Sequence, residues 1–224
     1  MPAQHGTRSR KVRSDASMMR VSGVILAAGS SVRMGQPKQL LRVGDRTLLD
    51  LVIAAALGSR LSEVVVVLGA SAEQVRSSVR TEETERLRIV VNGAHARGVS
   101  TSLRCGVAAC DPRSEGAAIL LADQPSIDSG RIDSMLDAFA ARGAPIVRPV
   151  FHRHDGGAVP GHPVLLARSV WPLLDTLEGD EGARALIARN PELLETVDVR
   201  GDEPEDVDTM DDYRRVCTTV SVER

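Results

Sequence analysis

VILAAGSSVRMGQPKQLL, residues 24–41, combines an apolar run with a polar, glycine-rich loop. The run VILAA has no polar alternation, which predicts a strand buried on both faces. The loop that follows carries two serines, an arginine and a lysine. In doubly wound α/β proteins, ligands bind beyond the carboxyl ends of such strands. The stretch therefore predicts a buried strand that leads into a ligand site.

Strand and helix patterns alternate along the chain. Buried apolar runs predict four strands, at residues 21–28, 63–69, 87–92 and 116–125. Helical patterns follow them, at residues 46–59, 71–80, 100–110 and 128–143. Ser71 and Gln74 have the spacing of a capping box, while Asp128 and Gly143 are expected to bound the last helix. This order predicts a three-layer, Rossmann-like α/β fold with a mostly parallel sheet.

The pattern changes after residue 143. APIVRPVF and HPVLLA, residues 144–151 and 162–167, read as strands on either side of a turn-rich segment. We expect them to form a small antiparallel elaboration of the same sheet.

The length and the composition of the chain predict a single domain and argue against nucleic-acid and membrane partners. A chain of 224 residues predicts one domain, here residues 21–217, between a disordered basic tail, residues 1–20, and a short tail, residues 218–224. A net charge of −2 and an aromatic content of 2% argue against a nucleic-acid partner. The apolar runs are too short to span a bilayer, so no membrane partner is expected. Three cysteines without metal-ligand spacing, and no signal-peptide core, predict a cytoplasmic protein.

The polar loop has the composition of a phosphate-binding cradle. Glycines let backbone N–H groups approach an anion, and hydroxyl, guanidinium and ammonium groups add donors or charge. The residues expected to make these contacts are Gly29, Ser30, Ser31, Arg33, Gly35 and Lys38. The glycine spacing matches neither the Walker pattern nor the dinucleotide fingerprint.

Lys38 stands out because this chain uses arginine for almost every cation. Of its 28 basic residues, only Lys11 and Lys38 are lysines, and Lys11 lies in the basic tail. A solvated surface lysine is the ordinary interpretation of any single lysine. The position of Lys38 beside the glycine loop favours a functional one.

Six motifs together resemble the molybdenum cofactor cytidylyltransferase-like family of nucleotidyltransferases. They are LAAGSSVRMGQPKQLL, NGAHARGVSTSL, LLADQPSI, PGHPVLL, GDEGARALI and DVDTMDDY, in the family's order between about residues 22 and 216. The resemblance implies an Mg²⁺-dependent transfer of CMP from CTP to a phosphorylated molybdopterin-type acceptor, with release of pyrophosphate. It also implies a client molybdoenzyme or its chaperone as a further partner.

The resemblance assigns roles to residues of this chain. Arg33, Lys38 and Asp123 would be catalytic, and Asp123 and Asp208 would bind the metal ion. His162 and Arg184 would contact the acceptor. The nucleotide would be bound by Leu26, Ala27, Ala28, Gly29, Ser30, Ser31, Arg33, Gly35, Lys38, Asn92, Ser100 and Ser102.

Other interpretations stay open for the function and for single residues. The Ala-Ala-Gly form of the first motif favours CTP, but a guanylyltransferase, or transfer to another phosphorylated acceptor, is an alternative. A nucleotide- or cofactor-binding chaperone is an alternative of a different class. Structural interpretations of the site residues are a strand-exit cap for Asp123, a helix cap for Asp208, Ser100 or Ser102, a turn for Asn92, packing for His162 and an ion pair with Glu181 for Arg184.

Overall fold

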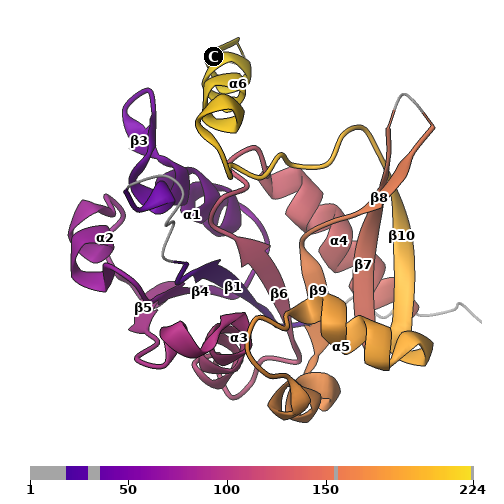
Figure 1. Cartoon of the computed structure of the whole chain (residues 1–224). Coiled ribbons are helices and arrows are strands. Elements are labelled where there is room, and N and C mark those ends of the chain that lie inside the picture. Colours follow the sequence, from indigo (N-terminus) through magenta and orange to yellow (C-terminus); the bar gives the residue numbers. More distant parts are fainter. Residues whose placement is uncertain (1–18, 30–35, 154–155, 223–224) are drawn as a thin grey trace, which may run out of the picture.

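The computed structural model describes residues 19–29, 36–153 and 156–222, and for residues 219–222 only the backbone. One large mixed sheet has the strand order β10-β7-β9-β6-β1-β4-β5, and β8 pairs with β7 (Figure 1). In chain order its strands are β1 Val21–Ala27, β4 Glu63–Leu68, β5 Leu87–Val91, β6 Gly116–Leu121, β7 Ile146–His152, β8 Ala158–Pro160, β9 Val164–Ala167 and β10 Leu194–Arg200. A separate two-stranded sheet pairs β2 (Arg42–Val43) with β3 (Arg46–Thr47).

Helices cover both faces of the large sheet, so the predicted three-layer α/β architecture is confirmed. One face packs on α1 (Leu48–Gly58), α2 (Ala72–Ser78) and α4 (Ser129–Arg142). The other face packs on α3 (Val99–Ala108), the 3-10 helix η4 (Arg168–Thr176) and α5 (Ala183–Arg189) (Figure 1). The other helical elements are α6 Met210–Val222, η2 Lys38–Leu40, η3 His95–Arg97 and η5 Pro191–Leu193.

Strand direction explains where a ligand site can form. β1 is parallel to β4 and to β6, and the antiparallel β9 joins β6 to β7. Two antiparallel steps restore the direction, so the carboxyl ends of β1, β6 and β7 lie at the same edge of the sheet. This arrangement confirms the mostly parallel sheet with an antiparallel elaboration.

Helix ends test the local predictions. Asp128 accepts a hydrogen bond from the backbone N–H of Arg131, and Gly143 ends α4 in the left-handed region at φ +63°, as expected. The predicted capping box at α2 is wrong, because Ser71 is left-handed, at φ 56°, and its side chain makes no cap hydrogen bond. The capping box lies instead at α1, between Thr47 and Asp50.

The structure describes the C-terminal boundary of the predicted domain but not the N-terminal tail before it. Residues 1–18 lie outside the described part of the chain, so the basic tail stays a prediction. At the other end α6 continues to Val222, past the expected boundary at residue 217. In the described ranges 19–29, 36–153 and 156–222, no helix is both long and apolar enough to cross a membrane.

Candidate active site

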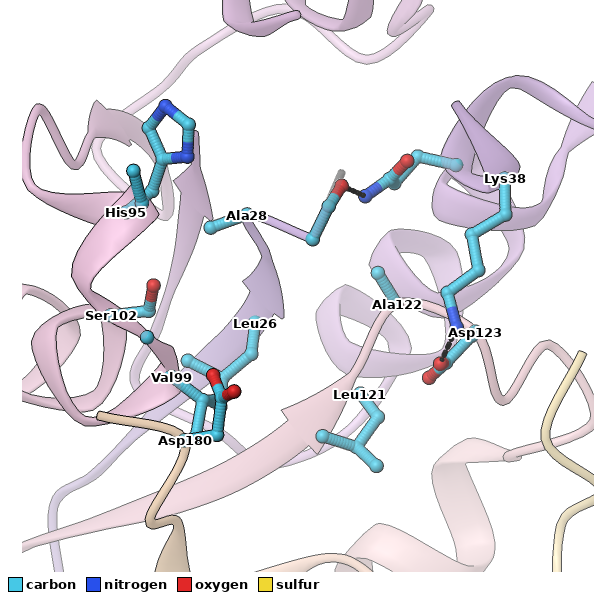
Figure 2. A pocket seen from close by; sticks show the side chains of 14 residues that line it. Leu26, Ala28, Lys38, His95, Val99, Ser102, Leu121, Ala122, Asp123 and Asp180 are labelled. Atoms are coloured by element: carbon cyan, nitrogen blue, oxygen red, sulfur yellow. Dashed lines mark hydrogen bonds and ion pairs between the residues drawn. The ribbon is translucent and has the colours of Figure 1, made fainter. Parts of the chain in front are cut away.

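A cavity of about 560 Å³ opens at the carboxyl ends of β1 and β6. Its wall consists of Leu26, Ala28, Gly29, Lys38, Gln39, His95, Ala96, Gly98, Val99, Ser102, Leu121, Ala122, Asp123 and Asp180. Figure 2 shows Lys38 and Asp123 at one end, with Ser102, Val99 and Asp180 at the other. Six predicted residues therefore line one cavity: Leu26, Ala28, Gly29, Lys38, Ser102 and Asp123.

Lys38 brings the two predicted metal ligands together. Its Nζ donates to Asp123 Oδ2, and it lies 3.0 Å from Asp208 Oδ1. The Lys38 side chain is only 18% exposed. Burial lowers the pKa of Lys38, but the two carboxylates outweigh burial and raise it above the ordinary value of 10.5. The ammonium group is therefore charged at neutral pH and joins the ends of η2, β6 and the segment before α6.

Hydrogen bonds join the segment before Asp208 to the residues that follow β6. The backbone N–H of Val207 donates to the carbonyl of Asp123 at 3.0 Å. Gln124 Nε2 donates to Asp206 Oδ1 at 2.9 Å. Burial and the nearby charges of Asp123 and Asp208 raise the pKa of Asp206. A third carboxyl group thus stands beside the predicted pair.

The donor set at this point fits a divalent cation. Asp123 and Asp208 converge on one positive charge, and carboxylate oxygens are the ligands that Mg²⁺ prefers. Within the described ranges, no three acidic, histidine or cysteine side chains form a closed metal cage. Mg²⁺ typically takes one or two carboxylates and completes its shell with water and substrate phosphates, so two converging carboxylates suffice.

Gln39 is a site residue that the sequence analysis missed. Its side chain is 3% exposed, and Nε2 donates to the carbonyls of Ala27 at 2.9 Å and Gly29 at 3.1 Å. Ala27 therefore contacts Gln39 and is not part of the cavity wall. Gln39 Oε1 is buried without a hydrogen-bond donor from the described chain. The sequence feature that could have indicated this role is the position of Gln39, a polar residue between Lys38 and two leucines in the run PKQLL.

Asn92 supports the cavity from behind. Its Nδ2 donates to Thr101 Oγ1 at 2.8 Å and to Ser102 Oγ at 3.0 Å, and its Oδ1 accepts from the N–H of Ala94. The last bond is the turn contact anticipated as a structural interpretation. Asn92 is buried and does not line the cavity, so its observed contacts position Ser102.

Ser100 lies outside the cavity wall, although Ser102 belongs to it. The backbone N–H of Ser100 donates to the carbonyl of Gly179, while its buried Oγ has no partner in the described chain. Gly98, at φ +107°, lets this loop approach, because a Cβ there would lie 2.1 Å from the Gly179 carbonyl group. The contact brings Asp180, which belongs to the GDEGARALI motif, to the cavity.

The predicted acceptor residues lie outside the cavity. Burial and the charge of Arg148, opposed by that of Asp123, lower the pKa of His162 to about 4, so its ring is neutral at pH 7. Arg184 lies on the exposed side of α5. The alternative ion pair of Arg184 with Glu181 is wrong, because Glu181 pairs with Arg189.

Four predicted nucleotide contacts cannot be placed. Ser30, Ser31, Arg33 and Gly35 lie outside the described residues, as does the middle of the glycine loop. The catalytic role of Arg33 therefore stays a prediction, as do those of Lys38 and Asp123, although both of these residues line the cavity.

Two curated proteins resemble most of the chain. Nicotine blue oxidoreductase of Paenarthrobacter nicotinovorans is 32% identical over 90% of this chain and 98% of its own length. The molybdenum cofactor cytidylyltransferase of Escherichia coli (strain K12) is 29% identical over 67% of this chain and 72% of its own length.

Solved structures give the same picture. The homologue of Mycobacterium tuberculosis Rv0371c from Mycobacterium sp. strain JC1 has a TM-score of 0.79 and 36% identity, over 92% of this chain and 98% of that one. Rv0371c of Mycobacterium tuberculosis H37Rv in complex with manganese has a TM-score of 0.73 and 30% identity, over 90% of this chain and 100% of that one. The family model for a MobA-like NTP transferase domain matches residues 23–195. The chain therefore belongs to the family of MobA-like NTP transferase domains and is a nucleotidyltransferase.

Proposed function

We propose that the chain transfers CMP from CTP to the phosphate of a molybdopterin-type acceptor, with Mg²⁺ as cofactor. The observation that carries this proposal is the junction of Lys38, Asp123 and Asp208 at one end of a 560 Å³ cavity. A cavity of this size accommodates a nucleotide-sized ligand. A cytoplasmic location and a client molybdoenzyme or its chaperone as partner belong to the same proposal.

In this reaction the protein has to position the two substrates and to neutralise the charge of the phosphate groups. An oxygen of the acceptor phosphate attacks the α-phosphorus, the bond from that phosphorus to the bridging oxygen breaks, and pyrophosphate leaves. Asp123 and Asp208 would hold the divalent cation, which supplies charge neutralisation on phosphate oxygens. Lys38 would hold the triphosphate by charge, and Ser102 would orient the nucleotide from the far end of the cavity.

The choice of CTP rests on the first strand and on one relative. The cavity wall contains Leu26, Ala28 and Gly29 of the Ala-Ala-Gly motif. The relative from Escherichia coli is named a molybdenum cofactor cytidylyltransferase. The manganese complex of Rv0371c supports a divalent cation, and Mg²⁺ is our choice among such ions. GTP, and another phosphorylated acceptor, stay as alternative substrates.

A different class of activity also has an observation in its favour. The relative from Paenarthrobacter nicotinovorans aligns with 90% of this chain. Its name describes an oxidoreductase and not a nucleotidyltransferase. A reductase would consume a reduced nicotinamide cofactor and release no pyrophosphate. A binding chaperone would bind nucleotide or cofactor and turn over neither.

The test begins with binding. Thermal unfolding would be followed with CTP, GTP, UTP and ATP, each with Mg²⁺, with Mn²⁺ and with neither. A ligand at about 100 times its dissociation constant adds about 2.7 kcal/mol, or roughly 5–10 °C for a chain of this size. A rise with CTP and Mg²⁺ that exceeds the rise with the other nucleotides supports the proposal, and a preference for GTP refutes the choice of donor.

The second step measures turnover. Pyrophosphate release from CTP would be followed with and without a phosphorylated molybdopterin acceptor, beside a parallel assay of nicotinamide oxidation. Steady, acceptor-dependent release supports the transferase. Nicotinamide oxidation without pyrophosphate would support the reductase, and binding without either reaction would support the chaperone.

A further inference from the structure

We propose that Asp180 is a specificity-determining residue, which accepts a hydrogen bond from the 4-amino group of the cytosine base and thereby favours CTP over UTP. The choice of a cytosine nucleotide rests on the proposed function. The place of Asp180 at the base end of the cavity rests on the lining of that cavity and on the contacts that hold the Asp180 loop against α3.

The two ends of the cavity differ in charge. Lys38 and Asp123 form one end, and Lys38 is the one lysine or arginine among the described residues of the wall. Val99, Ser102 and Asp180 form the opposite end (Figure 2). A triphosphate bound at the Lys38 end directs its nucleoside away from that end, because phosphates, ribose and base follow one another in the molecule. The base is therefore expected beside Asp180.

The loop that carries Asp180 is braced by its own hydrogen bonds. The backbone N–H of Glu178 donates to Glu181 Oε2 at 2.9 Å, and the N–H of Glu181 donates to the carbonyl of Glu178 at 3.0 Å. Arg189 of α5 pairs with Glu181 and donates to the carbonyl of Thr176 at 2.9 Å. The loop is thus held against the helix that follows it, which reduces the ordering that ligand binding would require.

A close approach of two glycines places the same loop against α3. A Cβ on Gly98 would lie 2.1 Å from the carbonyl carbon of Gly179, so a side chain at this position would clash with the loop. The backbone N–H of Ser100 donates to the carbonyl of Gly179 at 3.1 Å. Asp180 is the next residue, and it is therefore fixed beside the helix that carries Ser102.

The Asp180 carboxylate has no partner within the described chain. In residues 19–29, 36–153 and 156–222, no group forms a hydrogen bond or an ion pair with it. An ionised carboxylate accepts hydrogen bonds and cannot donate them. At the base end of the cavity it therefore fits a ligand group that donates, and it disfavours a carbonyl oxygen at the same place.

Ser102 supplies a complementary donor at this end of the cavity. Asn92 Nδ2 donates to Ser102 Oγ at 3.0 Å, so the hydroxyl oxygen already accepts a hydrogen bond. The hydroxyl hydrogen of Ser102 has no acceptor within the described ranges. Ser102 is buried and lines the cavity, so an acceptor atom of the ligand would complete its hydrogen bonding. One acceptor and one donor thus stand at the base end.

Cytosine matches this pair and uracil does not. The edge of cytosine presents the 4-amino group, which donates, next to N3, which accepts. Uracil presents O4, which accepts, next to N3–H, which donates. Asp and Glu accept from the amino group of cytosine in nucleic-acid recognition. With uracil, the carboxylate and O4 would face each other as two acceptors, which weakens binding.

The test is a binding cycle on the full chain, with Mg²⁺ and without the acceptor. Its main ligands are CTP, UTP and the 2-pyrimidinone ribonucleoside triphosphate, which has hydrogen in place of the 4-amino group of CTP. The variants are Asp180→Ala and Asp180→Asn. Asp175→Asn is the matched control, because Asp175 is exposed on η4 and lies outside the cavity wall. Isothermal titration gives the dissociation constants, and 2′-deoxy-CTP, 3′-deoxy-CTP, ATP and GTP complete the set.

We expect wild type to bind CTP about tenfold or more tightly than UTP or the 2-pyrimidinone analogue, because each of these lacks the hydrogen bond to a charged group. Asp180→Ala should weaken CTP binding by a similar factor and leave binding of the analogue within about twofold of wild type. Asp180→Asn should bind UTP more tightly than wild type does, because its amide N–H can donate to O4. Asp175→Asn should match wild type with every ligand.

Four results would overturn the cytosine contact. Equal losses of CTP and analogue binding in Asp180→Ala mean that Asp180 does not contact the amino group. Loss of the Asp180→Ala effect with a deoxy nucleotide, and not with the analogue, would assign the contact to the ribose. An unchanged dissociation constant for CTP with a raised acceptor KM would assign Asp180 to the acceptor. A wild type that binds GTP and not CTP would overturn the contact together with the choice of donor.

Failure of the proposed reaction is a separate result. It would appear as wild type that binds CTP but shows no acceptor-dependent release of pyrophosphate. The binding cycle needs no turnover, so it decides the role of Asp180 in that case as well.

Discussion

Lys38 Nζ lies 3.0 Å from Asp208 Oδ1, although 170 residues separate the two in the chain. The same ammonium group contacts Asp123, so one cation connects the glycine-loop side, the end of β6 and the segment before α6. This arrangement gives Lys38 two effects. It neutralises the carboxylates in the absence of ligands, and in the proposed reaction it would supply charge to a triphosphate once a divalent cation binds Asp123 and Asp208.

Replacement of Lys38 should therefore separate activity from stability. We expect Lys38→Ala to lower kcat/KM for CTP by about 100-fold or more, since a preorganised charge at the phosphates is lost. Without metal, the variant should also unfold at a lower temperature, because Asp123 and Asp208 lose their cation. Mg²⁺ should recover part of that stability. Steady-state kinetics and thermal unfolding with and without Mg²⁺ check both effects, and near-normal turnover would refute the role of Lys38.

Asp123 can be tested through its charge alone. Asp123→Asn keeps the size of the side chain and should remove the metal-dependent activity while the circular dichroism spectrum stays unchanged. The control is Asp211→Asn, because Asp211 is exposed and its ion pair within the described residues is with Arg214 on the same helix. Full activity of Asp123→Asn at saturating Mg²⁺ would leave Asp123 as an auxiliary ligand at most.

Two serines of α3 form a natural matched pair. Ser102 lines the cavity and Ser100 does not, although both were predicted to bind nucleotide. Ser102→Ala should weaken CTP binding by about threefold to tenfold, the value of one hydrogen bond. Ser100→Ala should leave binding unchanged and not lower stability, because the Ser100 hydroxyl has no partner to lose in the described chain. Isothermal titration with CTP decides, and equal losses in both variants would contradict this assignment.

A buried carboxylate at the other edge of the sheet predicts a pH dependence of stability. Glu63 accepts hydrogen bonds from Ser22 Oγ and Arg88 Nη2, both at 2.7 Å, and from the N–H of Asp111. Burial raises the pKa of Glu63, but these contacts outweigh it and lower the pKa below 4.5. We expect Glu63→Gln to lose about 1–3 kcal/mol of unfolding free energy at pH 7.

The sign of the pH effect follows from that lowered pKa. The contribution of ionised Glu63 is fully present above pH 4.5 and is lost as the pH falls through the folded-state pKa. The difference between wild type and Glu63→Gln should therefore shrink on acidification. Urea unfolding at a series of pH values measures it, with the exposed Glu73→Gln as control. A difference that grows toward acid pH would contradict the interpretation.

The fold was predictable where burial leaves a strong pattern. β1, β4 and β6 are buried on both faces, and their continuous apolar runs predicted buried strands correctly. β10 was not predicted, because LETVDVR is an edge strand with exposed charged residues and no long apolar run. The capping box at Ser71 failed because a left-handed residue starts α2, and backbone conformation of that kind is set by the preceding turn.

The site was predictable only in part, for a physical reason. The loop and Asp123 follow buried strands, so their place at the ligand edge could be inferred from local pattern. The pairing of Asp123 with Asp208 depends on tertiary structure and entered only through the family resemblance, and the contact of both carboxylates with Lys38 was not predicted. Arg148 reads as an ordinary strand residue, and only the tertiary structure reveals that its guanidinium group donates to the carbonyls of Pro160 and Gly161.

The rarity of lysine gives this protein a built-in chemical reporter. Lys11 and Lys38 are the only lysines in the chain, so an amine-acylating reagent finds one side-chain target in the described ranges. The paired, charged amine of Lys38 should react slowly, and we expect its reactivity to change when a ligand rearranges Asp123 and Asp208. The mass of the peptide that contains Lys38 therefore records occupancy of the site, in unmodified protein and in a crude extract.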